Sequence, residues 1–344
     1  MIEYNDLMNN IIFQNQGNTV SLNLFLFIVL AFLFSLAIDV IFGELPTRIH
    51  PVVMIGSVVS FFKKLFIGMK NRWSGLLTTL LTCAVACLVT LLILYLLSFN
   101  IVLFFIAYSI ILSSTFSVKM LLETAISVYD DLCESLDRAR ESVSYLVSRS
   151  TDELTESFIV SATIESMTEN ITDSYTAPIF YYMIFAVVLL LLNKNYLFVL
   201  LLIPLIYRIS NTLDAMLGYK TDELMNIGFF PAKLDDILNY VPSRITGLVM
   251  VLSAFLLRYD WKNAYNIMMR DARVCPSPNS GYTMATAAGA LDIQLIKKQT
   301  YILGDEIKPI DKDDIKKAVK LSRLTIILFT IMILIILTLV YVIL

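Results

Sequence analysis

The chain has 344 residues, with 26 Lys and Arg against 29 Asp and Glu, which gives a formal net charge of −3 at neutral pH. Hydrophobic residues make up 58% of the chain and charged residues 16%, and the mean hydropathy is +0.75. Soluble domains average about 45–50% apolar and about 25% charged residues. This composition excludes a soluble, disordered or disulfide-stapled chain and gives no electrostatic reason to expect nucleic-acid binding. It predicts an all-α, polytopic integral membrane protein, and the lipid bilayer is therefore an expected partner.

The apolar runs predict about six transmembrane helices. A helix needs about 20 residues to cross about 30 Å of hydrocarbon. Short polar turns at 98–100 and 193–195 are expected to join the second span to the third and the fourth to the fifth. The apolar stretch at 245–257 is too short to cross and is expected as an extra interfacial or re-entrant helix. The expected spans lie near residues 21–41, 76–97, 101–118, 176–192, 196–209 and 324–344.

The distribution of Lys and Arg predicts the orientation, because basic residues resist translocation across the membrane. Residues 1–20 contain none, and all except Lys194 fall in three segments, 43–75, 119–177 and 208–324. We therefore expect both termini outside a cell membrane that the chain crosses several times. The expected parts are an extracytoplasmic tail at 1–20 and a single membrane-embedded domain at 21–344, with cytoplasmic segments at 43–75, 119–175 and 210–323 that carry the active site.

A first group of polar residues contains three carboxylates, Glu165, Glu169 and Asp173. The pattern at 150–153, Ser-Thr-Asp-Glu, is similar to a capping box and predicts that their helix begins there. At about 100° per residue the three carboxylates fall within an arc of about 80°, where they repel one another unless a cation is bound. Hard oxygen ligands suit Mg²⁺ held together with substrate phosphates. A solvated acidic face is the alternative.

A second group follows the fifth expected span. Asn211 and Asp214 are three residues apart and share a helix face at the membrane boundary. Further along the chain, Asp235 and Asp236 are adjacent, with Asn239 at helical spacing. These aspartates suit a second metal or the orientation of an amine. Helix capping and ordinary ion pairing are an equally good interpretation.

A third group is a loop that two prolines stiffen. Arg270 and Arg273 precede it, and Ser277 and Asn279 lie within it, next to exposed N–H groups of Ser280-Gly281. Such a loop forms an anion-binding nest, and the two arginines suit phosphate binding. The sequence contains no glycine-rich nucleotide motif of the P-loop or G-x-G-x-x-G type. The phosphates of a nucleotide would therefore be held by metal, Arg and Lys.

His50 is the only histidine in the chain. A lone histidine is more typical of a structural hydrogen bond than of a catalyst, and it excludes a His-rich metal site. Apart from Asp39, and Arg208 at the end of the fifth, the six expected spans contain no Asp, Glu, Lys, Arg or His. Transporters and proton pumps commonly place such groups at mid-membrane depth, so a charge-coupled carrier is disfavoured.

In their order along the chain, these groups resemble the adenosylcobinamide-phosphate synthase family of cobalamin biosynthesis, often called CobD or CbiB, over roughly residues 35–295. Lys233 departs from the family pattern, where Arg is common, and Ile296-Lys297 replaces a glycine pair. The residues that carry the resemblance are Asp39, Gly43, Pro46, His50-Pro51-Val52, Gly56, Ser148-Arg149, Glu165, Glu169-Asn170, Asp173, Ala177-Pro178, Asn211-Thr212-Leu213-Asp214, Gly218-Tyr219-Lys220, Leu234-Asp235-Asp236, Asn239-Tyr240, Pro242, Arg244, Arg270-Asp271-Ala272, Ser277-Pro278-Asn279 and Gly281.

The resemblance implies a membrane-bound, ATP-dependent ligase that joins adenosylcobyric acid to aminopropanol or aminopropanol phosphate through an amide bond. The corrinoid is then a substrate rather than a bound cofactor. Mg²⁺ and ATP are expected at Glu165, Glu169 and Asp173. The expected catalytic residues are Asp214, Asp235, Asp236 and Lys220, and the expected nucleotide- or substrate-binding residues are Arg270, Arg273, Ser277, Asn279, Asn170, Asn211, Arg244 and His50.

The resemblance is also compatible with contact between this protein and other enzymes of cobalamin nucleotide-loop assembly, and with formation of a homo-oligomer. Two other functions compete with the ligase. One is a membrane-embedded, Mg²⁺-dependent alcohol-phosphotransferase or prenyltransferase, which also uses helical carboxylates at a membrane boundary. The other is a non-catalytic membrane assembly protein that keeps the same scaffold.

Overall fold

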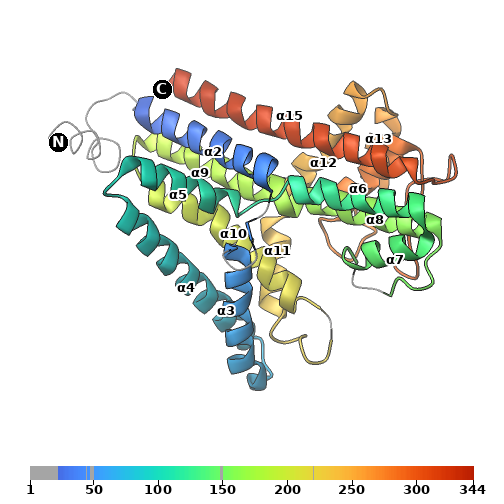
Figure 1. The fold of residues 1–344 in the computed structure, drawn as a ribbon, viewed down its shortest axis with the longest axis horizontal. Helices are drawn as coiled ribbons and strands as arrows, with labels where there is room; N and C mark the ends of the chain where they lie inside the picture. Colours follow the sequence, from blue (N-terminus) through green and yellow to red (C-terminus); the bar gives the residue numbers. More distant parts are fainter. Residues whose placement is uncertain (1–21, 44, 47–49, 148–149, 220) are drawn as a thin grey trace. The chain divides into compact units, whose positions relative to one another are not determined.

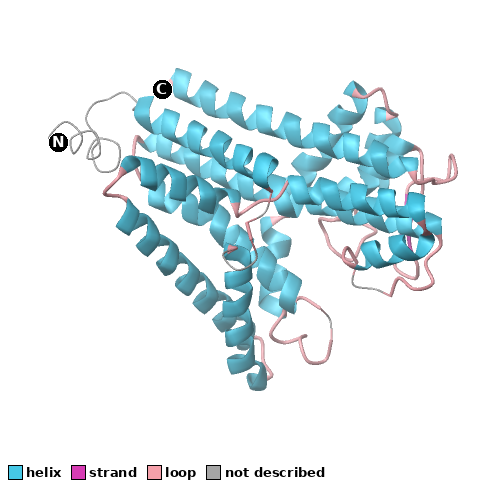
Figure 2. Cartoon of the chain, in the orientation of Figure 1, coloured by secondary structure: helices cyan, strands magenta, loops and turns pink. Residues whose placement is uncertain are grey.

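The computed structural model describes residues 22–43, 45–46, 50–147, 150–219 and 221–344. The described chain is almost entirely α-helical (Figures 1 and 2), and six of its helices are long and apolar enough to cross a membrane. Strands occur in the described residues only as a short hairpin, β1 (Leu295–Lys297) paired with β2 (Tyr301–Leu303). Helices satisfy their backbone hydrogen bonds internally, which hydrocarbon requires. The predicted all-α, polytopic membrane protein is confirmed.

Five of the long helices coincide with predicted spans. They are α2 (Leu22–Phe42), α4 (Trp73–Leu97), α10 (Leu197–Leu217), α15 (Asp313–Ile343) and the continuous helix Glu156–Leu192. The last consists of α8 (Glu156–Ile171), the π-helical segment η2 (Thr172–Thr176) and α9 (Ala177–Leu192).

The sixth long helix differs from the prediction. It is Pro51–Met69, made of α3 (Pro51–Phe66) and the 3₁₀ turn η1 (Ile67–Met69), and it lies in a segment expected to be cytoplasmic. The expected third span at 101–118 is instead the shorter α5 (Ile101–Ser113). This helix stops early because the Ser114 and Thr115 hydroxyls donate to the carbonyls of Ile111 and Leu112. The orientation of the chain stays a prediction.

The apolar stretch at 245–257 lies in α12 (Tyr240–Leu256). This helix follows α11 (Phe229–Leu238) with a bend of 44°, which is the geometry of a broken span or a re-entrant segment. Whether it crosses the membrane stays a prediction.

The described chain divides into two compact units, and the single membrane-embedded domain at 21–344 stays a prediction. The first comprises described residues of Met1–Ser117, Pro178–Ile237 and Met332–Leu344. In its core, α3 and α10 bury a shared apolar cluster together with the segment that follows α10. The cluster consists of Ile55, Val59, Leu205, Ile209, Leu213, Leu217, Leu224 and Ile227.

The second unit comprises Val118–Ala177 and Leu238–Ile331. It contains α6 (Lys119–Glu134), α7 (Leu136–Ser144), α8, α12, α13 (Trp261–Asp271), α14 (Gly281–Leu291), the hairpin and the first turns of α15. Every residue of α14 is buried, and this helix packs on α8, α12, α13 and β2. Gly289 is required there, because a Cβ would lie 2.8 Å from the Cα of Ala264. Small residues thus let the two backbones approach closely.

Two local predictions had different outcomes. The Asn100 side chain accepts hydrogen bonds from the N–H groups of Val102 and Leu103 and so begins α5, which confirms the turn at 98–100. The capping box at 150–153 is wrong. Helix α8 begins only at Glu156, and the Ser150 hydroxyl donates to the Asp152 carboxylate.

Cys133 offers a test of the predicted orientation. It lies on α6 and is exposed, whereas Cys275 is buried and Cys83 and Cys87 are half-buried. If the segment 119–175 is cytoplasmic, an impermeant maleimide should label Cys133 in inside-out vesicles and leave it unmodified in sealed right-side-out vesicles. The variant Cys133→Ser identifies the labelled site. Labelling of wild-type protein alone in right-side-out vesicles would reverse the predicted orientation.

Candidate functional site

Helix α8 and the hairpin enclose a cavity of about 160 Å³ in the second unit. We call it the acidic cavity. Residues at i and i+4 share one face of a helix, which brings Glu165 and Glu169 together. Residues directly opposite each other in a strand ladder share one face of it, and Lys297 on β1 faces Tyr301 on β2. The polar lining consists of Glu165, Ser166, Glu169, Asn170, Lys297 and Tyr301.

The carboxylate of Glu165 is held at both oxygens. Its side chain is buried, with 5% of the residue exposed. The Ser161 hydroxyl donates to Oε1 at 2.6 Å, and the Tyr301 hydroxyl donates to Oε2 at 2.7 Å. A buried carboxylate requires hydrogen-bond donors in place of water, and these two neutral hydroxyls provide them.

Asp173 does not share the position of the two glutamates. It lies in η2, where the α-helical spacing assumed for the three carboxylates ends. It is absent from the lining of the acidic cavity. Within the described part of the chain, no three His, Cys, Asp or Glu side chains are grouped so as to hold a metal ion. Two of the three predicted ligands therefore meet in one cavity, and metal binding stays a prediction.

The prolyl loop is fixed by Arg244 of α12. The guanidinium stacks between the rings of Tyr240 and Tyr282, 3.5 and 4.3 Å from their centroids. It donates to Asn279 Oδ1 at 3.1 Å and to the Pro278 carbonyl at 3.3 Å. The structure thus brings together Arg244 and Asn279, two of the predicted binding residues.

Within the loop, the Ser277 hydroxyl accepts the N–H of Asn279 at 3.2 Å. Two of the residues predicted to form an anion nest therefore hold the loop in its turn. The buried Asn279 amide is the point at which Arg244 reaches this turn.

Arg270, a predicted phosphate ligand, is bound to two carboxylates. It donates to Asp271 at 2.6 and 2.8 Å and to both oxygens of Asp305 at 3.0 Å. Asp271 also accepts the N–H of Gly304, directly after β2, at 2.8 Å. This network attaches the hairpin to the end of α13. Arg273 is exposed and interacts with the Tyr282 hydroxyl.

Cys275 connects the prolyl loop with the acidic cavity. Burial raises the pKa of its thiol to about 12, and the charges of Glu169 and Glu165 add to that rise, although a hydrogen bond with Ser280 and the charge of Lys297 oppose it. The loop and the two glutamates are therefore close enough to interact electrostatically. The thiol stays protonated at neutral pH and is a poor nucleophile.

The remaining predicted residues lie in the first unit. Asp214 of α10 is close enough to Asp236 of α11 for their charges to interact, and Asp236 pairs with Lys233 at 3.2 Å. Gly218 leaves room for the Asp214 carboxylate, which a Cβ at residue 218 would overlap. Asp235 is half-buried on α11.

Of the other predicted residues, two make local contacts and the rest lie outside the described residues. Arg208 donates to Asn211 at 3.2 Å on α10. His50 accepts the N–H of Val52 and caps α3, which is the structural role favoured for a lone histidine. Lys220 lies outside the described residues, as do Ser148 and Arg149.

Ser161, Lys297 and Tyr301 line or support the acidic cavity but were not predicted as site residues. Ser161 precedes Glu165 by one helical turn, a spacing that the sequence displays. Tyr301 is 136 positions from Glu165, and no sequence pattern indicates that contact.

Known proteins with similar sequences identify the family of this chain. The family model described as CobD/Cbib protein matches residues 32–322, a range that contains every site residue named above. The chain belongs to the CobD/CbiB family. It is 45% identical to the probable cobalamin biosynthesis protein CobD of Methanothermobacter thermautotrophicus, over 87% of this chain and 94% of that protein. No solved structure matches the chain.

More distant members of the family cover similar lengths. The probable cobalamin biosynthesis protein CobD of Methanococcus aeolicus is 39% identical over 79% of this chain and 86% of its own. The cobalamin biosynthesis protein CobD of Dehalococcoides mccartyi is 35% identical over 82% and 89%. The family resemblance read from the ordered motifs is thereby confirmed.

The Arg270–Asp271–Gly304 network predicts a pH-dependent contribution to stability. Burial alone would raise the pKa of Asp271, but hydrogen bonds from Arg270 and Gly304 outweigh burial and lower it. Because the pKa is lower in the folded state, the contribution is complete above about pH 4, the unfolded value, and is lost as the pH falls through the folded pKa. Asp271→Asn should therefore lower the free energy of unfolding by about 1–3 kcal/mol at neutral pH.

Thermal unfolding of the detergent-solubilised protein, measured from neutral pH to about pH 3, checks this prediction. The difference between the unfolding midpoints of wild type and Asp271→Asn should become smaller below about pH 4. Glu306→Gln, which changes an exposed carboxylate beside Asp305, is the matched control and should leave the midpoint unchanged. A difference between the two midpoints that stays constant across this pH range would show that Asp271 does not act through its charge.

Proposed function

We propose that this protein is an adenosylcobinamide-phosphate synthase, a membrane enzyme of cobalamin biosynthesis. In this proposal it uses ATP to join a propionate carboxylate of adenosylcobyric acid to aminopropanol or its phosphate. The observation that carries the proposal is the acidic cavity, built from Glu165, Glu169, Asn170 and Lys297 inside the region that matches the family. The names of the relatives, which place those proteins in cobalamin biosynthesis, support the same conclusion.

The chemistry requires a site for nucleotide phosphates. A carboxylate does not react with an amine until one of its oxygens has become part of a leaving group, a phosphate or a nucleotide. Forming that group means stabilising the negative charge of the transferring phosphoryl or adenylyl group. Lys297 in the cavity and the exposed Arg273 next to the prolyl loop are suitable cations. The proposal assigns Arg270 to support of the hairpin, because two carboxylates already bind it.

The cavity also suits a magnesium ion delivered with the nucleotide. Mg²⁺ is usually bound by one or two carboxylates plus substrate phosphates rather than by a complete protein cage. The half-buried Glu169 and the neighbouring Asn170 offer oxygen ligands of this kind, with Glu165 alongside. Such an ion would neutralise phosphate charge during activation of the carboxylate. Asp173 is a weaker candidate for this role, because it is absent from the cavity lining.

The attacking amine must lose a proton. We assign its acceptor to the aspartates of the first unit, Asp214, Asp235 and Asp236, on the strength of the family motif. The active site is proposed to face the cytoplasm, because the basic segments around it resist export.

Product analysis tests the proposed reaction. The purified protein, reconstituted in lipid vesicles, is given adenosylcobyric acid, ATP and Mg²⁺ together with aminopropanol or aminopropanol phosphate. Mass spectrometry should find the corresponding amide, formed only with ATP, and the two parallel reactions identify the amine. A lipid product would instead favour the phosphotransferase or prenyltransferase, and no consumption of ATP with both substrates present would favour a non-catalytic protein.

The role of Glu169 is tested by Glu169→Gln, which keeps the side chain's size and removes its charge. Loss of a carboxylate that would hold the Mg²⁺ ion, and with it the charge that stabilises the transferring phosphate, should reduce the rate of amide formation on the order of 100-fold or more. Glu156→Gln is the matched control, because Glu156 is exposed at the start of the same helix and does not line the cavity. Turnover of Glu169→Gln at the wild-type rate, with normal membrane insertion, would remove Glu169 from the site.

A further inference from the structure

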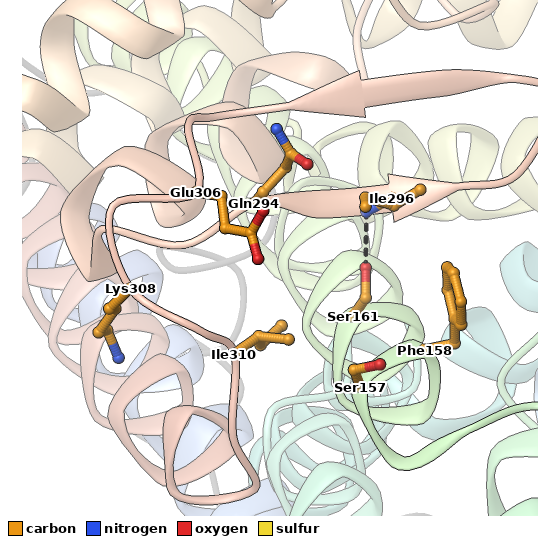
Figure 3. A pocket seen from close by; sticks show the side chains of 8 residues that line it. All are labelled: Ser157, Phe158, Ser161, Gln294, Ile296, Glu306, Lys308 and Ile310. Atoms are coloured by element: carbon orange, nitrogen blue, oxygen red, sulfur yellow. Dashed lines mark hydrogen bonds between the residues drawn. The ribbon is translucent and has the colours of Figure 1, made fainter.

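Two side chains, Ser161 and Tyr301, connect the hairpin to the Glu165 carboxylate through hydrogen bonds. In the first path, the Ile296 N–H of β1 donates to the Ser161 hydroxyl at 2.8 Å, and this hydroxyl donates in turn to Glu165 Oε1 at 2.6 Å. Figure 3 shows the first of these bonds, drawn between Ser161 on α8 and the backbone of Ile296. Ser161 is buried, with 2% of the residue exposed, so water does not compete for these bonds.

The second path uses Tyr301 of β2. Its hydroxyl donates to Glu165 Oε2 at 2.7 Å, and only 8% of the residue is exposed. Burial, together with the charge of Glu165, raises the pKa of Tyr301 above its ordinary value. The phenol therefore stays protonated and remains a donor throughout the physiological pH range.

The two paths meet one carboxylate from opposite strands of one hairpin. Antiparallel pairing fixes the register, with Ile296 opposite Ile302 and Lys297 opposite Tyr301. A shift of β1 would therefore break the bond from Ile296 to Ser161 and move Lys297 in the acidic cavity, and a shift of β2 would break the bond from Tyr301 to Glu165. The residue directly after β2 is also fixed by a hydrogen bond, because the Gly304 N–H donates to the Asp271 carboxylate.

We infer that the hairpin is a positioning element for the phosphate-binding site, with Ser161 and Tyr301 as the positioning residues that fix Glu165. This inference rests on the proposed function and deepens it. Glu165 would line the site in a fixed orientation, and Glu169 and Asn170 would hold a metal ion delivered with the nucleotide. A carboxylate whose two oxygens are already hydrogen-bonded loses no side-chain freedom when the ligand binds, so the ordering cost is met during folding.

Ligand binding by the full-length protein in detergent tests the inference. The probe is a non-hydrolysable ATP analogue with Mg²⁺, titrated by calorimetry. Tyr301→Phe and Ser161→Ala should each weaken binding about tenfold, the effect of losing a hydrogen bond to a charged group. In a Glu165→Gln background, adding Tyr301→Phe should weaken binding much less than it does in wild type, because both changes act through the same carboxylate.

Two matched controls separate positioning from general loss of packing. Tyr175→Phe removes another buried hydroxyl of the second unit, which bonds to Thr330, and should leave binding unchanged. Ser157 lies one helical turn before Ser161 and lines the pocket shown in Figure 3, and its hydroxyl bonds to Thr155, so Ser157→Ala should also leave binding unchanged. If Tyr301→Phe proves too unstable to purify, Ser161→Ala carries the test alone.

Wild-type binding in both Tyr301→Phe and Ser161→Ala would overturn the inference. So would an equal effect of Tyr301→Phe with and without Glu165→Gln. These results leave the proposed function intact if the amide still forms. Conversely, the expected binding pattern without any amide product would overturn the proposed reaction and retain the positioning role in nucleotide binding.

Discussion

The close packing around α14 is the constraint on which the candidate site depends. This helix is buried along its whole length, and it contacts α8, α12, α13 and β2. The closest contact in this packing requires a residue without a side chain, because a Cβ at Gly289 would overlap the backbone of α13. Because α14 touches both α8 and the hairpin, its position determines the distance between Glu165 and Tyr301.

The second unit buries carboxylates in two different ways. Asp271 is matched by a guanidinium and a backbone N–H, so its charge is compensated within the network. Glu165 accepts hydrogen bonds from two neutral hydroxyls and lines the cavity together with Glu169. The first arrangement suits a structural attachment, and the second suits a site that receives a cation or a metal-bound phosphate.

The membrane imposes a second constraint, because backbone polar groups in hydrocarbon must be satisfied within the chain. The long helix Glu156–Leu192 meets this requirement while passing from the polar cavity to an apolar span. Between them lies η2, a π-helical turn, and such turns are frequent at functional sites. It keeps the backbone bonded while changing the direction in which the following side chains project. Asp173, placed at this turn, therefore leaves the row that Glu165 and Glu169 begin.

The sequence alone determined the fold class, most spans and the family, because runs of apolar residues and ordered motifs are local properties of the chain. It also placed Glu165 and Glu169 on one face, since helical spacing is fixed by backbone geometry. Only the tertiary structure decided that Asp173 lies apart, that Arg270 is bound by Asp271 and Asp305, and that Tyr301 reaches Glu165. Such contacts join residues far apart in sequence, and they depend on how α14 packs and how the hairpin folds back on α8. Spacing along a chain does not encode these distances, so tertiary packing determined the partners of each charged group.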